Sequence, residues 1–482
     1  MGGPLAGMVA RTSSCAALMN TSVSPRRRQW ILAAAVFLFV VAAQLWLVAR
    51  VGTDIPFYDQ WNIEGRWLYP GWNEGSIHVG DLLKPYNEHR IFWTHLLNLV
   101  LFKLDGQWDP LVQLAAGTGL RACCAGGLCW ALCHGLSWRG GVAVAMGVAF
   151  AFLPHLAWHA VLWAIESCAF FVLGFSILSM ALLGAVDCSP LRIVGGWAAG
   201  VAALLSMGPG ALVPVALLGL VGVRAAESRR LDRTIWAQTW PALGLLAAAF
   251  ALRAKVSEHA QVAAGSLGQF LIAAGRILAW PHVGQPLAML AINSPLLMLV
   301  FGRLAGRRRA VRGEDFVLLI GGWSFAVGLA TAWMRGGSPE LIAGVPSRYV
   351  DFIVLLPLAN AWCAVQLARE ATRRRIAITA VLAWSLFLLV GWAGLSVEVW
   401  RGVIGPRSRD RAAPERLARE FQLSRDPAVF AGQPRLLVPH PNLGVVSAVL
   451  DDPRMKGALP PTLQPKQPRG PLSRAVRWLF GR

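Results

Sequence analysis

Acidic side chains are scarce in this sequence, and several of them gather in one short segment. The 482 residues include 25 Asp and Glu against 45 Lys and Arg. Between residues 51 and 90 there are six acids, which are Asp54, Asp59, Glu64, Glu74, Asp81 and Glu88. A positioned carboxylate can take a proton from a hydroxyl group and so act as a general base. We therefore single out Asp59 and Asp54 as candidate catalytic residues.

Glu166 is a third candidate catalytic residue, in the apolar string WAIESCAFF. A carboxylate in apolar surroundings costs free energy unless it faces a cavity, which makes Glu166 a functional candidate. The alternative is that Glu166 caps the N-terminus of the following helix, where the helix dipole favours a negative charge.

Two polar groups next to apolar runs have the chemistry of anion binding. One precedes the run 91–104, and the other lies in the string GVPSRYVDF. Arg is well suited to bind phosphate oxygens, because its guanidinium donates two parallel hydrogen bonds. Arginine at a membrane boundary can also simply extend toward the polar interface, which is the alternative interpretation. The candidate substrate-binding residues are Glu88, His89, Arg90, Arg348 and Tyr349.

A metal site is less strongly indicated. His155 and His159 are one helical turn apart, which is a spacing that can hold a metal ion, but no nearby carboxylate completes the ligand set. We expect these histidines to form hydrogen bonds, assign no metal ligand, and leave a divalent metal ion open as a cofactor.

The elements that must position these residues are membrane helices. The chain is 56% hydrophobic and only 15% charged, and apolar runs alternate with basic clusters. Because a hydrocarbon core needs roughly 20 residues per helix, this pattern predicts an all-α, polytopic membrane protein. Eleven spans are expected, at residues 30–49, 110–136, 141–158, 168–186, 193–205, 211–223, 235–252, 283–301, 316–334, 350–367 and 376–396.

The net charge of +20 is explained by basic loops on the cytoplasmic side rather than by a nucleic-acid partner. Arg26, Arg27 and Arg28 place the N-terminus inside. The rich content of Ala, Gly and Arg is typical of a bacterial protein, so we expect a multi-pass protein of the plasma membrane, in contact with membrane lipids.

The run 91–104 is expected not to cross. If it crossed, every later basic cluster would fall on the outside, against the positive-inside rule. Its fourteen residues also reach only about 21 Å as a helix, which is shorter than the core. We therefore predict an interfacial helix within a large extracytoplasmic loop, residues 51–109.

The expected domains follow from this topology. Residues 1–29 form a basic cytoplasmic segment, and residues 30–400 form the transmembrane domain. Residues 401–482 form a polar, basic tail. An odd number of spans places this tail outside, although its positive charge opposes the positive-inside rule. Its end, residues 472–482, has the pattern of an amphipathic helix resting on a membrane surface.

The strings DIPFYDQWNIEGRWLYPGW and NEHRIFWTHLLNLVLF resemble the first outer loop of the GT-C superfamily of membrane glycosyltransferases. The resemblance covers about residues 30–186. It implies a catalytic acid after the first span, a juxtamembrane helix, and a second acid before the fourth span, where Glu166 falls. Many members carry two adjacent acids in this loop, but Asp59 is followed by Gln60, so the equivalent acid is Asp59 or Asp54, and metal binding stays open.

The resemblance implies transfer of a hexose or pentose from a polyprenyl-phosphate donor to an extracytoplasmic glycan, lipid or protein acceptor. Two other functions are kept open. A transporter or flippase of a lipid-linked sugar would show paired repeats and charges deep within its spans. A non-catalytic membrane assembly protein would carry the loop acids only as solvated surface.

Overall fold

The computed structural model describes residues 24–187, 189–229, 232–254, 261–464 and 470–481, and over these residues the fold is all-helical, without β-strands. Each of the eleven expected spans contains a helix. They are α2 (Pro25–Val51), α5 (Pro110–Leu132), α6 (Trp138–Ala151), α8 (Ser167–Leu183), α9 (Pro190–Leu204), α10 (Val213–Ser228), α11 (Arg233–Ala251), α13 (Ala288–Leu304), α14 (Glu314–Arg335), α17 (Leu355–Glu370) and α18 (Arg374–Val399).

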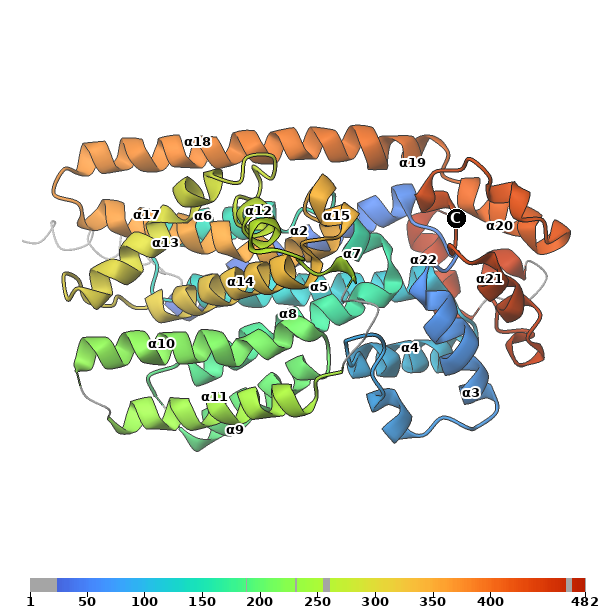
Figure 1. Cartoon of the computed structure of the whole chain (residues 1–482), viewed down its shortest axis with the longest axis horizontal. Helices are drawn as coiled ribbons and strands as arrows, with labels where there is room; N and C mark the ends of the chain where they lie inside the picture. The colour runs from blue at the N-terminus through green and yellow to red at the C-terminus, as the bar shows by residue number, and fades with distance from the viewer. Residues whose placement is uncertain (1–23, 188, 230–231, 255–260, 465–469, 482) are drawn as a thin grey trace, which may run out of the picture.

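Six helical stretches in the described part of the chain are long and apolar enough to cross a membrane. They are Arg26–Val51, Ala164–Leu183, Gly208–Ser228, Glu314–Arg335, Ser347–Glu370 and Arg374–Arg409. Of the other five expected spans, the apolar helices α6, α9 and α13 are shorter, at 10–17 residues, and the longer α5 and α11 do not meet the criterion, so the expected number of eleven spans is not reached. The helix α12 (Leu267–Leu278) was not among the expected helices. Figure 1 shows it end-on, across the long helices.

Three of the basic clusters lie together at one end of the helical bundle, which we call the basic end (Figure 1). Arg224 pairs with Asp315 at 2.6 Å, and Arg303 pairs with Glu227 at 2.6 Å. Arg308 reaches Glu370 at 2.8 Å. These ion pairs join the ends of α10, α13, α14 and α17 that border the α10–α11, α13–α14 and α17–α18 connections, so these three clusters lie near one another.

The opposite end, which we call the loop end, carries α3 (Tyr69–Asn73) and α4 (Phe92–Asp105). The α4 helix is the predicted interfacial helix. Its first amide donates to the Leu205 carbonyl at 3.0 Å, and Asp105 at its end accepts from the Ser473 amide at 3.0 Å. Gly106 ends the helix in a left-handed conformation, with φ of 69°. Both termini of α4 therefore lie at the loop end.

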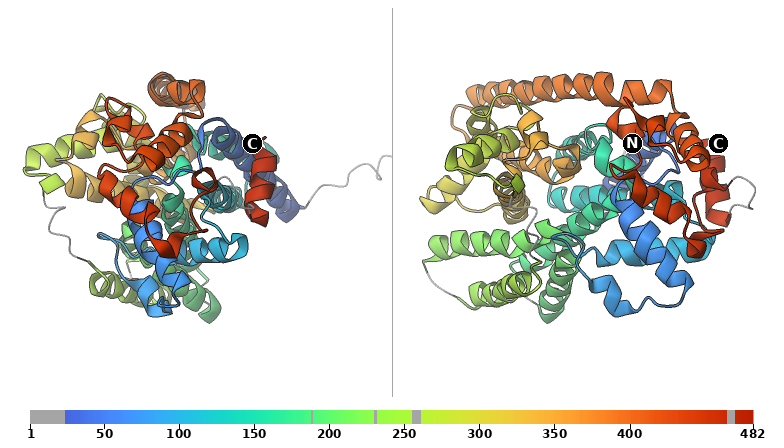
Figure 2. Two further views of the ribbon diagram at one scale, coloured as in Figure 1. Left: turned by 90° about the vertical axis from the view of Figure 1, so that its right-hand side faces the viewer. Right: turned by 45° about the vertical axis from the view of Figure 1, so that its right-hand side comes forward.

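The C-terminal tail folds onto this loop. Its helices α20 (Ala413–Ser424), α21 (Leu443–Leu450) and α22 (Pro471–Phe480) lie at the loop end, and Figure 2 turns them toward the viewer, against the first loop. Loop and tail share a second apolar core, whose members include Trp61, Leu68, Tyr69, Phe102, Trp108, Leu417, Phe421, Val449 and Met455. The tail is thus a packed part of the structure, and α22 contacts α4 and α5.

Candidate functional site

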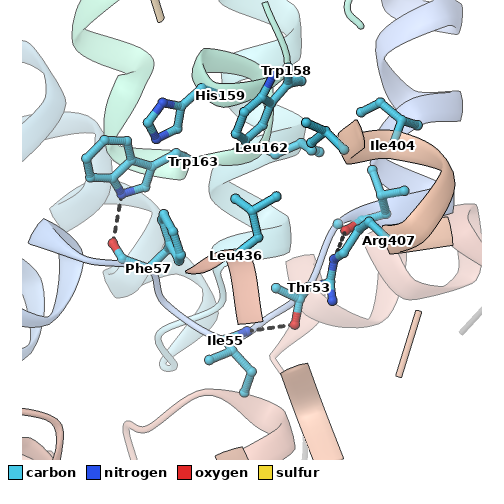
Figure 3. Close-up of a pocket in the computed structure, with 13 residues that line it drawn as sticks. Thr53, Ile55, Phe57, Trp158, His159, Leu162, Trp163, Ile404, Arg407 and Leu436 are labelled. Carbon is cyan, nitrogen blue, oxygen red and sulfur yellow. Dashed lines mark hydrogen bonds between the residues drawn. The ribbon is translucent and has the colours of Figure 1, made fainter. Parts of the chain in front are cut away.

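A cavity of about 380 Å³ lies where the first loop, the α6–α8 connection, the α14–α16 connection and the tail meet. An adjoining cavity of about 60 Å³, whose lining residues Figure 3 shows, shares six lining residues with the larger cavity, so the two form one groove. The larger part is lined by Phe57, Tyr58, Trp158, His159, Trp163, Glu340, Pro346, Ser347, Arg348, Val403, Arg435 and Leu436. Its walls are mostly aromatic and apolar, with charged groups at one side.

Hydrogen bonds between distant segments hold these walls together. The Trp163 indole donates to the Phe57 carbonyl at 2.7 Å, as Figure 3 shows, and the His159 amide donates to Ser347 Oγ at 3.1 Å. The Tyr58 amide donates to the Pro439 carbonyl at 2.7 Å. Tyr58 adopts a φ of 49°, a region that residues other than glycine seldom occupy, and such strain gathers at functional sites.

Two arginines face the cavity. Arg348, predicted to bind phosphate, stacks over Tyr349, with its guanidinium carbon 5.1 Å from the ring centre. Arg435 donates to the Tyr58 hydroxyl at 2.7 Å and lies over the same ring. Arg435 was not predicted, because the tail had no recognisable motif and only the fold brings it here. Both guanidinium groups also contact Glu340.

Asp59 lies directly beside the cavity wall. Its Oδ1 accepts a hydrogen bond of 2.9 Å from the Tyr86 hydroxyl. Burial raises the pKa of Asp59, while the Tyr86 hydrogen bond and the charges of His440 and Arg348 oppose that rise. A half-buried carboxylate with a raised pKa and one fixed hydrogen bond has the properties of a general base.

Glu166 lies in the turn Ala164–Glu166, which links cavity residue Trp163 to α8. Its side chain is 5% exposed, and Glu166 occupies the N-cap position of α8, although its side chain makes no hydrogen bond to the α8 backbone. Within the described part of the chain, Glu166 Oε2 has no hydrogen-bond partner, and the carboxylate interacts electrostatically with Arg348 and Asp59. The structure thus brings together three of the predicted residues, Asp59, Glu166 and Arg348.

Asp54 has a different place. It is fully buried, accepts from the Thr462 amide at 2.9 Å and pairs with Arg477 of α22 at 2.6 Å. Arg477 also reaches Asp109, at 3.3 Å. Asp54 therefore attaches the tail to the first loop, whereas Asp59 follows the cavity residue Tyr58 and interacts electrostatically with Arg348, which makes Asp59 the better candidate acid.

The predicted group at residues 88–90 binds neighbouring protein segments. Arg90 donates to the carbonyls of Leu83, at 2.6 Å, and Leu252, at 3.2 Å. Glu88 pairs with Arg335 at the end of α14, and the Gly208 amide donates to His89 Nδ1 at 3.3 Å. These contacts fix the start of α4 against the bundle, and none of the three residues lines the cavity.

A buried ion pair fixes the short helix that follows Arg348. The Arg121 guanidinium makes two hydrogen bonds to Asp351, at 2.9 and 2.7 Å, and both side chains are fully buried. Asp351 is in α16 (Val350–Ile353), three residues after Arg348. Nothing local in the sequence identifies Asp351 as the partner of Arg121.

The two candidate metal-binding histidines do not converge. His155 hydrogen-bonds to Ser396 Oγ at 2.9 Å, and His159 stacks between Trp158 and Trp163, with ring centres 5.1 and 4.9 Å away. Among the described residues, no group of three His, Cys, Asp or Glu side chains is arranged to hold a metal ion.

Comparisons with family models, with curated proteins and with solved structures find no match to this chain.

Proposed function

We propose that this protein is a GT-C-like membrane glycosyltransferase that moves a sugar from a lipid-phosphate donor to a hydroxyl group outside the cytoplasm. One observation carries the proposal. Asp59, Glu166 and Arg348 come from three segments far apart in the sequence. Arg348 lines the aromatic cavity, and the two carboxylates lie close enough to Arg348 and to each other to interact electrostatically. A base, a second carboxylate and a cation are the groups that this reaction needs.

The phosphate of the donor binds Arg348 and Arg435. Charge-assisted hydrogen bonds from two guanidinium groups stabilise the negative charge that grows on the phosphate as it departs. The smaller part of the groove suits the first isoprenoid units, since Val51, Ile55, Leu162, Val403 and Ile404 make it apolar.

Asp59 is the base in this mechanism. The acceptor hydroxyl oxygen attacks the anomeric carbon, and Asp59 takes the hydroxyl proton as the new C–O bond forms. The bond between the anomeric carbon and the phosphate oxygen breaks, and its electron pair leaves with the lipid phosphate. Glu166 stabilises the positive charge that develops on the sugar ring, as carboxylates do in other glycosyl transfers.

The buried Arg121–Asp351 pair favours an enzyme over a flippase. Its two charges neutralise each other through two hydrogen bonds, and both side chains are fully buried. A transporter is expected to turn charges within its helices toward a substrate pathway. We therefore place the chemistry at the loop end and leave this pair a structural role.

The test is a transfer assay with membranes that contain the full-length protein. A panel of polyprenyl-phosphate hexoses and pentoses, labelled in the sugar, is incubated with these membranes and with membranes lacking the protein. We expect at least one donor to be consumed only when the protein is present, with release of polyprenyl phosphate. If no donor is consumed while a lipid-linked sugar changes leaflet in reconstituted vesicles, the flippase is the better account.

A further inference from the structure

Glu340 occupies the space between the two cavity arginines. Its Oε2 accepts from Arg348 Nη2 at 2.9 Å, and its Oε1 accepts from Arg435 Nη1 at 3.3 Å. The three side chains line the same cavity, although Arg348 precedes the last long helices and Arg435 belongs to the tail. The carboxylate of Glu340 therefore occupies the position between the two guanidinium groups where an anionic ligand would bind.

Each carboxylate oxygen of Glu340 meets one guanidinium group, as two phosphate oxygens would. We propose that Glu340 competes with the phosphate group of the ligand for Arg348 and Arg435. It thereby lowers the affinity of the site for a phosphate and leaves the binding of uncharged ligands unchanged. This inference rests on the proposed function for the nature of the ligand and adds a residue that sets its affinity.

The Glu340 carboxylate can move away from the two arginines while both guanidinium groups keep their places. Glu340 lies on the short helix α15 (Pro339–Ala343), which the buried Leu341 anchors in the core. The Glu340 side chain is 37% exposed, so rotation about its own bonds can carry the carboxylate into solvent. Arg348 keeps its contact with the Tyr349 ring, and Arg435 keeps its hydrogen bond to Tyr58.

This competition has a consequence for affinity. A site that is open for only a fraction of the time binds its ligand more weakly by that fraction. An uncharged lipid cannot replace the contacts that Glu340 makes, whereas a phosphate can. A neutral lipid gains no contact from either arginine, so Glu340 changes the affinity of this site for phosphate-bearing ligands and not for neutral ones.

The test measures binding of farnesyl phosphate, and of uncharged farnesol, to the full-length protein in a neutral detergent. If Glu340 holds the arginines about nine-tenths of the time, Glu340→Gln should bind farnesyl phosphate about tenfold more tightly. Farnesol binding should not change. Asp451→Asn is the matched control, because it removes the same charge from an exposed ion pair of the tail, with Arg425.

The gain should disappear when Arg435→Ala is combined with Glu340→Gln. Equal or weaker binding of farnesyl phosphate by Glu340→Gln overturns the inference, as does a lack of binding by both proteins. The sugar-transfer assay judges the proposed function separately. Tighter binding without any transfer would keep the role of Glu340 and reject the enzyme, while transfer with unchanged binding would do the reverse.

Discussion

Arg477, in the last helix of the chain, lies 2.6 Å from the carboxylate of Asp54, which is 423 residues earlier, at the start of the first loop. The same guanidinium group reaches Asp109 at the N-terminus of α5. Because the tail also supplies Arg435 and Leu436 to the cavity, this contact links the stability of the tail to the shape of the site.

Replacing Arg477 by Met should destabilise the protein. The change leaves the buried Asp54 and Asp109 without their counter-charge, and breaking a buried pair in this way costs about 3–5 kcal/mol. Thermal unfolding in detergent should show a lower Tm, with earlier proteolysis of the tail. Arg474→Met, on the exposed side of the same helix, is the control and should change Tm little. An unchanged Tm for Arg477→Met would contradict the assigned ion pairs.

Tyr86→Phe should shift the pH profile of transfer. The base must be deprotonated, so kcat/KM rises with pH through the pKa of Asp59. The Tyr86 hydrogen bond favours the carboxylate and lowers that pKa, and its removal should raise it further. The acidic limb of the profile should therefore move to higher pH, while the high-pH rate changes less. A limb that stays in place would show that Asp59 is not the titrating base.

Arg348→Ala should raise KM for the lipid-phosphate donor. A charge-assisted hydrogen bond contributes roughly 1.5–3 kcal/mol, which corresponds to about a 10-fold to 100-fold weaker donor affinity. Arg348→Lys should restore only part, because an ammonium group does not reproduce the planar fork of a guanidinium. Donor titrations of the three proteins, at equal membrane abundance, provide the comparison. A full rescue by Lys would argue against a bidentate contact.

The buried carboxylate of Glu64 should make the stability of the folded protein depend on pH, independently of catalysis. This fully buried carboxylate accepts from Asn98, Gln60 and Gln113 at 2.7, 3.1 and 3.2 Å. Burial raises its pKa from 4.5 to about 7. The folded state therefore holds a proton that the unfolded state has lost, so stability falls as pH rises from 4.5 to 7, by roughly 3 kcal/mol.

Glu64→Gln resembles the protonated form and should remove this part of the pH dependence. Thermal unfolding of both proteins between pH 4.5 and 8 gives the difference that belongs to Glu64. The wild-type Tm should fall relative to the variant as pH rises. A constant difference would mean that Glu64 is ionised in the folded protein throughout this range.

The helical architecture was predictable because apolar runs of membrane length leave few alternatives for a buried backbone. The run 91–104 was predicted to be a helix in the same way, and the structure has α4 there. Glu166 and Arg348 could also be chosen as candidate site residues from the sequence. A lone charge next to an apolar run costs free energy, so its presence indicates a function. Each of these inferences used only neighbouring residues.

Long-range contacts could not be predicted in this way. Arg435 lies in a polar tail rich in Arg and Pro, where nothing local distinguishes it from other arginines. Asp54 and Asp59 are five residues apart and look alike in the sequence. One faces the tail and the other lies beside the cavity only because Arg477 and Tyr86 approach them from distant segments.

We propose that Asp59 and Glu166 are the catalytic residues of sugar transfer. The most direct test compares transfer of labelled sugar from the polyprenyl-phosphate donor by wild type, Asp59→Asn and Glu166→Gln, at equal abundance in the membrane. Asp59→Asn keeps the size of the side chain but cannot take the proton, so transfer should fall about 100-fold to 10,000-fold. Glu166→Gln should also lose most of its activity. Full transfer by both variants would contradict the account.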